Sequence, residues 1–164
     1  MRIIANLNKT TIQKKMPNFK TFHNYKSIYS VDMMLCYLNT YGHKKQKLLV
    51  EDFVPQLKEK GWGQWSLMDV IEKMHLKKYK EDADRIEKAN LEYPIIVTGN
   101  HTIVDGYHRI AKAYLEKKKY IDAYVFHSDL MNKFILSKDM NFIKVHTDTE
   151  IHTLLELWTK RFCK

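Results

Sequence analysis

Short apolar runs separated by polar residues predict a β-hairpin past the middle of the chain. Residues 95–97 (Ile-Ile-Val) and 102–104 (Thr-Ile-Val) are rich in β-branched side chains, which favour strands. Gly and Asn within the connection, residues 98–101, favour a tight turn. After the second run the apolar spacing becomes helical, so we expect a helix from about Tyr107 and then a strand over residues 121–126.

Apolar residues at helical spacing predict further helices on both sides of this hairpin. Residues 31–41 are expected to form a helix that stops at Gly42. Ser66 is expected to cap another helix, with Asp69 placed for a capping box. Further helices are predicted over residues 78–90, around Leu130 to Ile135 and over residues 151–158, and a strand over residues 48–50.

Length and composition indicate one folded domain. Of the 164 residues, 45% are hydrophobic and 29% are charged, a balance typical of globular proteins. We expect an α+β domain over residues 31–164, preceded by a basic arm over residues 1–30. Leu154, Leu155, Leu157 and Trp158 form an apolar face that we expect to be buried within the monomer, with a homodimer interface as the alternative.

The cysteines and the apolar runs are informative about the cellular location of the protein. Cys36 and Cys163 match no zinc or CxxC spacing, so we expect no disulfide framework and a reducing setting. No apolar run has the length needed to cross a bilayer, and the N-terminus lacks a signal-peptide core. These features predict an intracellular protein without a membrane partner, either cytoplasmic or, depending on its source, nuclear or virion-internal.

The positive charge is concentrated near the N-terminus. Residues 1–47 carry nine Lys or Arg and one acidic residue, whereas residues 48–164 carry 19 basic and 18 acidic residues. One interpretation is a solvated basic arm. The other is a segment that binds nucleic acid or an acidic partner, since spaced cations release counterions from phosphate backbones. Aromatic residues among the cations would suit base stacking or docking onto the domain: Phe19, Phe22, Tyr25 and Tyr29.

The residues where the hairpin meets the next helix are the main candidate for chemistry. Gly106 would let an oxygen-rich ligand approach the main chain, at a helix end whose backbone N–H groups attract anions. His108 and Arg109 would add donors to a phosphate, and Tyr107 would pack or lie against a base. The predicted phosphate-binding residues are Gly106, Tyr107, His108, Arg109 and Lys112, and the predicted catalytic residues are Asp105 and His108.

Two other interpretations of this turn are open. Asp105 would simply cap the helix and Gly106 would simply permit the turn, although capping requires neither His108 nor Arg109. A divalent metal could also be held by His101, Asp105 and His108. We expect no metal site made of protein ligands alone, and favour a magnesium ion shared with nucleotide phosphates.

The segment over residues 91–126 resembles the ParB/sulfiredoxin superfamily, and residues 48–90 resemble it loosely. The likeness is carried by Pro94-Ile95-Ile96-Val97, the hairpin, Ile103-Val104-Asp105-Gly106-Tyr107-His108-Arg109, the helix that follows and the returning strand. The resemblance implies a small mixed β-sheet with packed helices, to which this chain adds N- and C-terminal helical segments. It also implies that the Gly-x-His-Arg turn opens a helix that holds nucleotide phosphates.

Members of this superfamily differ in chemistry. Sulfiredoxins place a cysteine where this chain has Tyr107, so sulfiredoxin activity is not expected. Partition ParB proteins carry a DNA-reading helix-turn-helix after this domain, for which residues 127–164 offer too little length. Free serine kinases have an Asp-Gly-x-x-Arg-like turn and an upstream carboxylate that takes the hydroxyl proton. Glu51 and Asp52 are candidates for that carboxylate.

Two functional hypotheses follow from these features. In the first, the protein is a phosphotransferase that uses ATP, ADP or CTP with Mg²⁺ and a small hydroxyl acceptor, or a nucleotide hydrolase. Asp105 then orients the magnesium ion or the attacking hydroxyl. In the second, the protein is a nucleic-acid-binding or nucleotide-gated module of the ParB-like nuclease class, and the basic segment 1–47 contacts the polymer.

Overall fold

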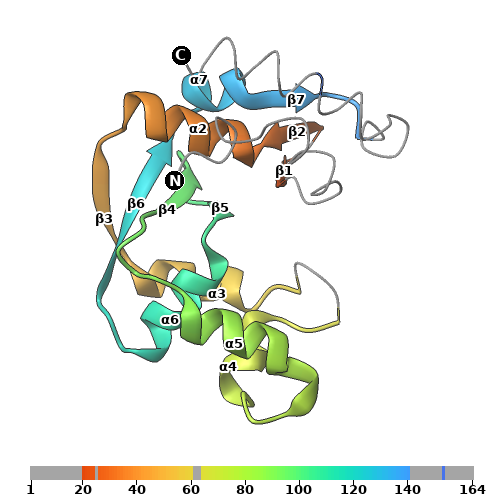
Figure 1. The fold of residues 1–164 in the computed structure, drawn as a ribbon, viewed down its shortest axis with the longest axis vertical. Helices are drawn as coiled ribbons and strands as arrows, with labels where there is room; N and C mark the ends of the chain where they lie inside the picture. The colour runs from red at the N-terminus through yellow and green to blue at the C-terminus, as the bar shows by residue number, and fades with distance from the viewer. Residues whose placement is uncertain (1–19, 25, 61–63, 141–152, 154–164) are drawn as a thin grey trace. The chain divides into compact units, whose positions relative to one another are not determined.

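Strands and helices are mixed along the chain, which confirms the predicted α+β class (Figure 1). The computed structural model describes residues 20–24, 26–60, 64–140 and 153. The chain divides into two compact units. Unit 1 consists of residues 1–43 and 128–164, and unit 2 of residues 44–127.

Unit 2 contains a mixed four-stranded sheet. Its strands are β3 (Lys45–Leu49), β4 (Ile95–Thr98), β5 (Ile103–Asp105) and β6 (Tyr120–Phe126), in the order β3-β6-β4-β5. β4 and β6 are parallel, and the other two pairs are antiparallel. The predicted hairpin is confirmed as β4 and β5, and the predicted strand at residues 48–50 is β3, which begins earlier.

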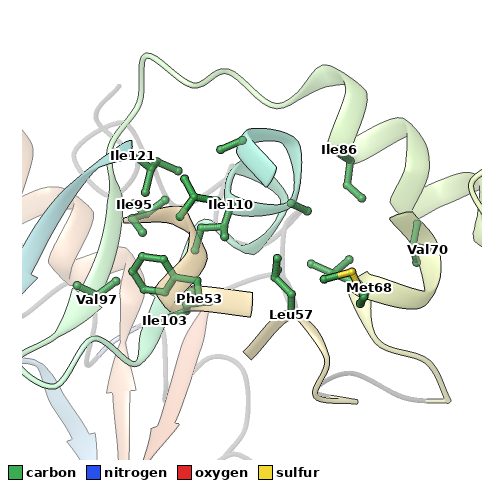
Figure 2. Packing of buried hydrophobic residues seen from close by; sticks show 14 of the residues in the cluster. Phe53, Leu57, Met68, Val70, Ile86, Ile95, Val97, Ile103, Ile110 and Ile121 are labelled. Atoms are coloured by element: carbon green, nitrogen blue, oxygen red, sulfur yellow. The ribbon is translucent and has the colours of Figure 1, made fainter. Parts of the chain in front are cut away.

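The helices of unit 2 enclose its core together with this sheet. They are η1 (Val50–Phe53), α3 (Val54–Leu57), α4 (Leu67–Glu72), η2 (Lys77–Tyr79), α5 (Lys80–Lys88) and α6 (Tyr107–Leu115). Ile95 and Ile121 of the sheet lie close to Ile110 of α6, and all three are at most 4% exposed (Figure 2). Burial of such aliphatic side chains stabilises the fold by about 1.5–3 kcal/mol each. This packing fixes the start of α6 against the sheet.

Local signals for two of these helices are confirmed. The Ser66 hydroxyl accepts a hydrogen bond from the Asp69 N–H at 3.1 Å, and the Asp69 carboxylate accepts one from the Ser66 N–H at 2.8 Å. This is the predicted capping box at the start of α4. The helix predicted over residues 78–90 is α5, with Ala83 and Ile86 as its buried stripe.

Unit 1 combines a small sheet with a well-formed helix. Its elements are β1 (Thr21–Asn24), β2 (Ser27–Ser30), α2 (Val31–Tyr41), α7 (Ser128–Met131), η3 (Asn132–Phe134) and β7 (Ile135–Ser137). The strand order is β1-β2-β7, all antiparallel. The helix predicted over residues 31–41 is confirmed, and Gly42 follows it with a positive φ of 69°.

Three expectations for unit 1 require correction. Thr21–Asn24 and Ser27–Ser30, which were expected to belong to the basic arm, are paired antiparallel as β1 and β2. The helix expected around Leu130 to Ile135 ends earlier, because Ile135 belongs to β7. Cys36, which is buried on α2, is disulfide-bonded, although its spacing gave no sign of a disulfide.

Two predictions fall largely outside the described residues. These are the course of residues 1–19 and the C-terminal helix over residues 151–158 with its apolar face. Among the helices that the structure describes, none has the length and apolar character required to span a bilayer.

Candidate functional site

The turn between β5 and α6 has a backbone conformation that requires glycine. Gly106 has φ 111° and ψ 22°, in the left-handed region that other residues rarely adopt. A Cβ atom at this position would lie 2.5 Å from Cγ2 of Ile95, so the space beside the turn is already filled by β4. α6 begins at the next residue, Tyr107, so that Gly106 is its N-cap residue and offers no side chain to cap it. The N-terminal N–H groups of α6 carry the positive end of the helix dipole at this turn.

Arg109 fastens this turn to the start of β4. Its Nη1 donates to the carbonyl oxygens of Tyr93 at 3.1 Å and Pro94 at 2.7 Å. Its Nη2 donates to Oδ2 of Asp105 at 2.8 Å. The side chains of Arg109 and Asp105 are only 18% and 17% exposed. The planar guanidinium thus bridges two carbonyls and a carboxylate, a geometry that a lysine cannot reproduce.

His108 points to a different partner from that of Arg109. Its Nε2 lies 3.1 Å from Oδ1 of Asp82, a residue of α5. The other carboxylate oxygen of Asp82 accepts a hydrogen bond from Nε1 of Trp65 at 3.1 Å. The predicted convergence of His108 and Arg109 on one spot is therefore not found, because the two side chains have separate partners.

The environment of Asp82 favours its ionised form. Burial raises the pKa of this carboxyl, but the hydrogen bonds from His108 and Trp65 outweigh burial and hold the pKa below its ordinary value. Asp82 is thus a carboxylate at neutral pH. It can fix the orientation of the His108 ring and stabilise the imidazolium when His108 is protonated.

A pocket of about 640 Å³ opens beside this pair. It is lined by Gln64, Trp65, Leu67, Glu81, Asp82, Arg85 and His108. Trp65 also packs edge-on against Tyr79, with ring centroids 5.2 Å apart. Glu81 and Arg85 form an ion pair of 2.5 Å at the wall. The pocket therefore offers an indole surface, carboxylates and a guanidinium to a polar ligand.

Two of the predicted phosphate-binding residues serve the fold in this structure. Tyr107 packs against the core of unit 2, and burial, together with the negative charge of Glu59, raises the pKa of its hydroxyl. Lys112 donates from Nζ to the carbonyl oxygens of Glu87 and Ala89, both at 2.8 Å. Lys112 therefore binds the carbonyls at the end of α5, away from the N-terminal turn of α6.

The remaining candidates are placed as follows. Glu51 and Asp52, the proposed upstream carboxylates, are exposed on η1. His101 lies in the β4–β5 connection with a positive φ of 63°. Within the described part of the chain, no group of three or more His, Cys, Asp or Glu side chains is arranged to hold a metal ion.

Asp82 is the functional candidate that sequence reasoning missed. It lies 26 positions before His108, in a run of charged residues that looks like an ordinary helix surface. A carboxylate in the first turn of a helix is favoured by the helix dipole, so the position of Asp82 in α5 did not indicate a further role.

Comparisons of the chain with protein-family models, with curated proteins and with solved structures find no match. The resemblance to the ParB/sulfiredoxin superfamily therefore depends on the motif and its setting between strand and helix.

Proposed function

We propose that this protein is a nucleotide-binding phosphotransferase of the ParB/sulfiredoxin type that acts on a hydroxyl acceptor. The observation that carries the proposal is the hydrogen-bonded pair His108 and Asp82 at the wall of the 640 Å³ pocket. A histidine held by an ionised carboxylate is a common acid–base arrangement, and here it lies in the first turn of a helix.

The turn that precedes His108 supplies the phosphate end of the site. Gly106 brings the main chain into the left-handed conformation without a side chain, and the N-terminal N–H groups of α6 carry the positive end of the helix dipole. Asp105 and Arg109 hold this turn against β4. We therefore assign Asp105 and Arg109 a positioning role. In this proposal, the backbone of the turn and the His108 side chain contact the phosphates.

The chemical step follows from this arrangement. The acceptor hydroxyl oxygen forms a bond to the terminal phosphorus, and its proton passes to the pair His108 and Asp82. The P–O bond to the leaving nucleotide breaks, and the leaving oxygen takes the bonding electrons. A magnesium ion that arrived with the nucleotide would neutralise charge on the phosphates, and it would need few protein ligands because Mg²⁺ keeps most of its waters.

Phosphoryl transfer can be tested directly on the full chain. ATP, ADP or CTP with Mg²⁺ is incubated with a panel of small hydroxyl compounds, and new phosphate monoesters are followed by ³¹P NMR. We expect turnover with wild type. His108→Ala should lower the rate by a factor of about 100 to 10,000, the usual contribution of a general acid–base group. Asp82→Asn should lower it less, because the imidazole remains.

A histidine elsewhere in unit 2 provides the control. His75 is exposed and belongs to neither the turn nor the pocket, so His75→Ala should keep the wild-type rate. Equal rates for His108→Ala and wild type would show that the pair is not the acid–base group. The absence of turnover with every nucleotide and acceptor would remove the phosphotransferase proposal.

A further inference from the structure

Unit 2 carries a basic surface that is separate from the pocket. On β3 and β6, antiparallel pairing sets Lys45 opposite Tyr124, Lys47 opposite Asp122 and Leu49 opposite Tyr120, so these residues share one face of the sheet. The loop between α6 and β6 adds Lys117, Lys118 and Lys119 beside Tyr120. We call the exposed set Lys45, Lys47, Leu49, Lys117, Lys118, Lys119 and Tyr120 the lysine–tyrosine face.

The backbone holds the lysine loop in a defined position. The N–H groups of Lys117 and Lys118 donate to the carbonyl oxygens of Tyr114 and Ala113 at the end of α6, at 3.0 and 2.9 Å. Lys117 takes a positive φ of 55°, as in a helix-terminating turn. The carbonyl oxygen of Lys119 accepts from the N–H of Val50, at the end of β3. The loop is thus fixed at both sides, and its cations require little ordering before they bind an anion.

An exposed ring lies among these cations. Tyr120 is 47% exposed, and Nζ of Lys119 is 5.4 Å from the centre of its ring. The carboxylate of Asp122 on this face is paired with Lys47 at 3.0 Å, and Glu116 precedes the lysine loop in the sequence. The Lys47 side chain remains 72% exposed, and the lysines outnumber the carboxylates. A polyanion with flat apolar groups complements such a surface.

We propose that the lysine–tyrosine face binds single-stranded nucleic acid. The ammonium groups would lie along the phosphates, and the Tyr120 ring would stack on a base, the combination used by proteins that bind single strands without sequence preference. The four residue steps of β6 from Tyr120 to Tyr124 span about 13 Å, so the strand-paired lysines follow a line as a polymer backbone does. This binding is independent of the nucleotide pocket.

Fluorescence anisotropy with the full chain and a labelled single strand of about 16 nucleotides tests the proposal. The triple variant Lys117→Glu, Lys118→Glu, Lys119→Glu should bind at least about tenfold more weakly than wild type. Between about 50 and 200 mM salt, its slope of log affinity against log salt should be shallower by about 2, since each phosphate contact on a single strand contributes about 0.7. Tyr120→Ala should weaken binding about tenfold, whereas Tyr120→Phe should not.

A second lysine cluster of unit 2 provides a matched control. Lys73, Lys77 and Lys78 are exposed, and Lys78 lies over the ring of Tyr79 at 4.8 Å, but Tyr79 is only 5% exposed and cannot receive a base. The triple variant of these lysines to Glu changes the net charge equally and should keep most of the affinity. Denaturation midpoints equal to wild type would show that the variants are folded.

Three results would overturn the proposal. One is an equal loss of affinity in both triple variants, which would mean that only the overall charge matters. Another is wild-type affinity both in Tyr120→Ala and in the triple variant of Lys117, Lys118 and Lys119. The third is no binding of the oligonucleotide by wild type, while acidic peptide or anionic vesicles bind to the same lysines.

Discussion

At the scale of single residues, Gly106 is the described glycine with the least room for a Cβ atom. Gly106→Ala should lower the free energy of unfolding by about 3 kcal/mol, because the new methyl group would meet Ile95 at 2.5 Å and φ would stay near 111°. Urea denaturation measures this change. Gly42 provides the control, since it also has a positive φ, 69°, but nothing lies within 4 Å of a Cβ there.

Comparison of Gly106→Ala with Gly42→Ala separates the energetic cost of backbone strain from the cost of steric overlap. Gly42→Ala should cost about 1 kcal/mol, the usual penalty for a left-handed conformation. If both substitutions cost the same, the close packing of Ile95 against the turn is not rigid, and the turn is less tightly held than we conclude.

The ionisation of Asp82 gives a prediction about pH. Its pKa is lowered from the ordinary value of 3.8, because the bonds from His108 and Trp65 outweigh the opposing effect of burial. Ionised Asp82 therefore stabilises the fold above pH 3.8, and this contribution is lost as the pH falls through the folded-state pKa. NMR titration of the carboxyl carbon should find a midpoint below 3.8 in wild type.

Removal of a hydrogen-bond donor should shift that midpoint in a known direction. In His108→Ala and in Trp65→Phe, the pKa of Asp82 should move upward, because each substitution removes a bond that favours the carboxylate. A midpoint in wild type at or above 3.8 would contradict the hydrogen bonds on which the proposed acid–base pair depends.

At the scale of secondary-structure elements, the edge strand β5 depends on one side chain from α3. Gln56 donates from Nε2 to the His101 carbonyl oxygen and accepts from the Ile103 N–H at Oε1, both at 2.8 Å. Gln56→Ala should lower the free energy of unfolding by about 1–3 kcal/mol, because it leaves both backbone groups unpaired. Amide exchange should become faster at Ile103, just before the candidate turn.

Gln46 provides the comparison for this substitution. It is exposed on β3, so Gln46→Ala should leave both the stability and the exchange rate of Ile103 nearly unchanged. Unchanged exchange at Ile103 in Gln56→Ala would mean that β5 is held by its pairing with β4 alone.

Elements governed by local signals could be predicted from the sequence, and those governed by distant contacts could not. The capping box of Ser66 and Asp69 is complete within four residues, and residues 31–41 carry their own helical period. The β1–β2 hairpin was missed because Ile28, Tyr29 and Ser30 are buried in succession, without the alternation that marks a half-buried strand.

The candidate site divides in the same way. The strand, the glycine turn and the helix at Asp105 to Tyr107 follow from residue types and spacing, and the structure has them at these positions. The partners of His108 and Arg109 do not follow from residue types and spacing. Asp82 and the carbonyls of Tyr93 and Pro94 come from other elements, and only the packing of α5 and β4 around α6 brings them near.

At the scale of the whole molecule, unit 2 has a core that is complete in itself. Every described residue of its main hydrophobic cluster, from Val50 to Val125, lies within residues 44–127. A fragment of these residues should therefore fold alone, with a cooperative urea transition and the same Ile103 amide protection as the full chain. A fragment without a cooperative transition would show that unit 1 is required for the fold of unit 2.

The central claim is that unit 2 binds a nucleotide at the turn before α6, and thermal unfolding of the full chain with nucleotides tests it most directly. ATP, ADP and CTP are each added with Mg²⁺, and phosphate at the same concentration serves as the control for any anion. At about 100 times the Kd, a bound nucleotide should raise the free energy of unfolding by about 2.7 kcal/mol, and less in His108→Ala. If no nucleotide raises the midpoint of wild type above the phosphate control, the claim is wrong.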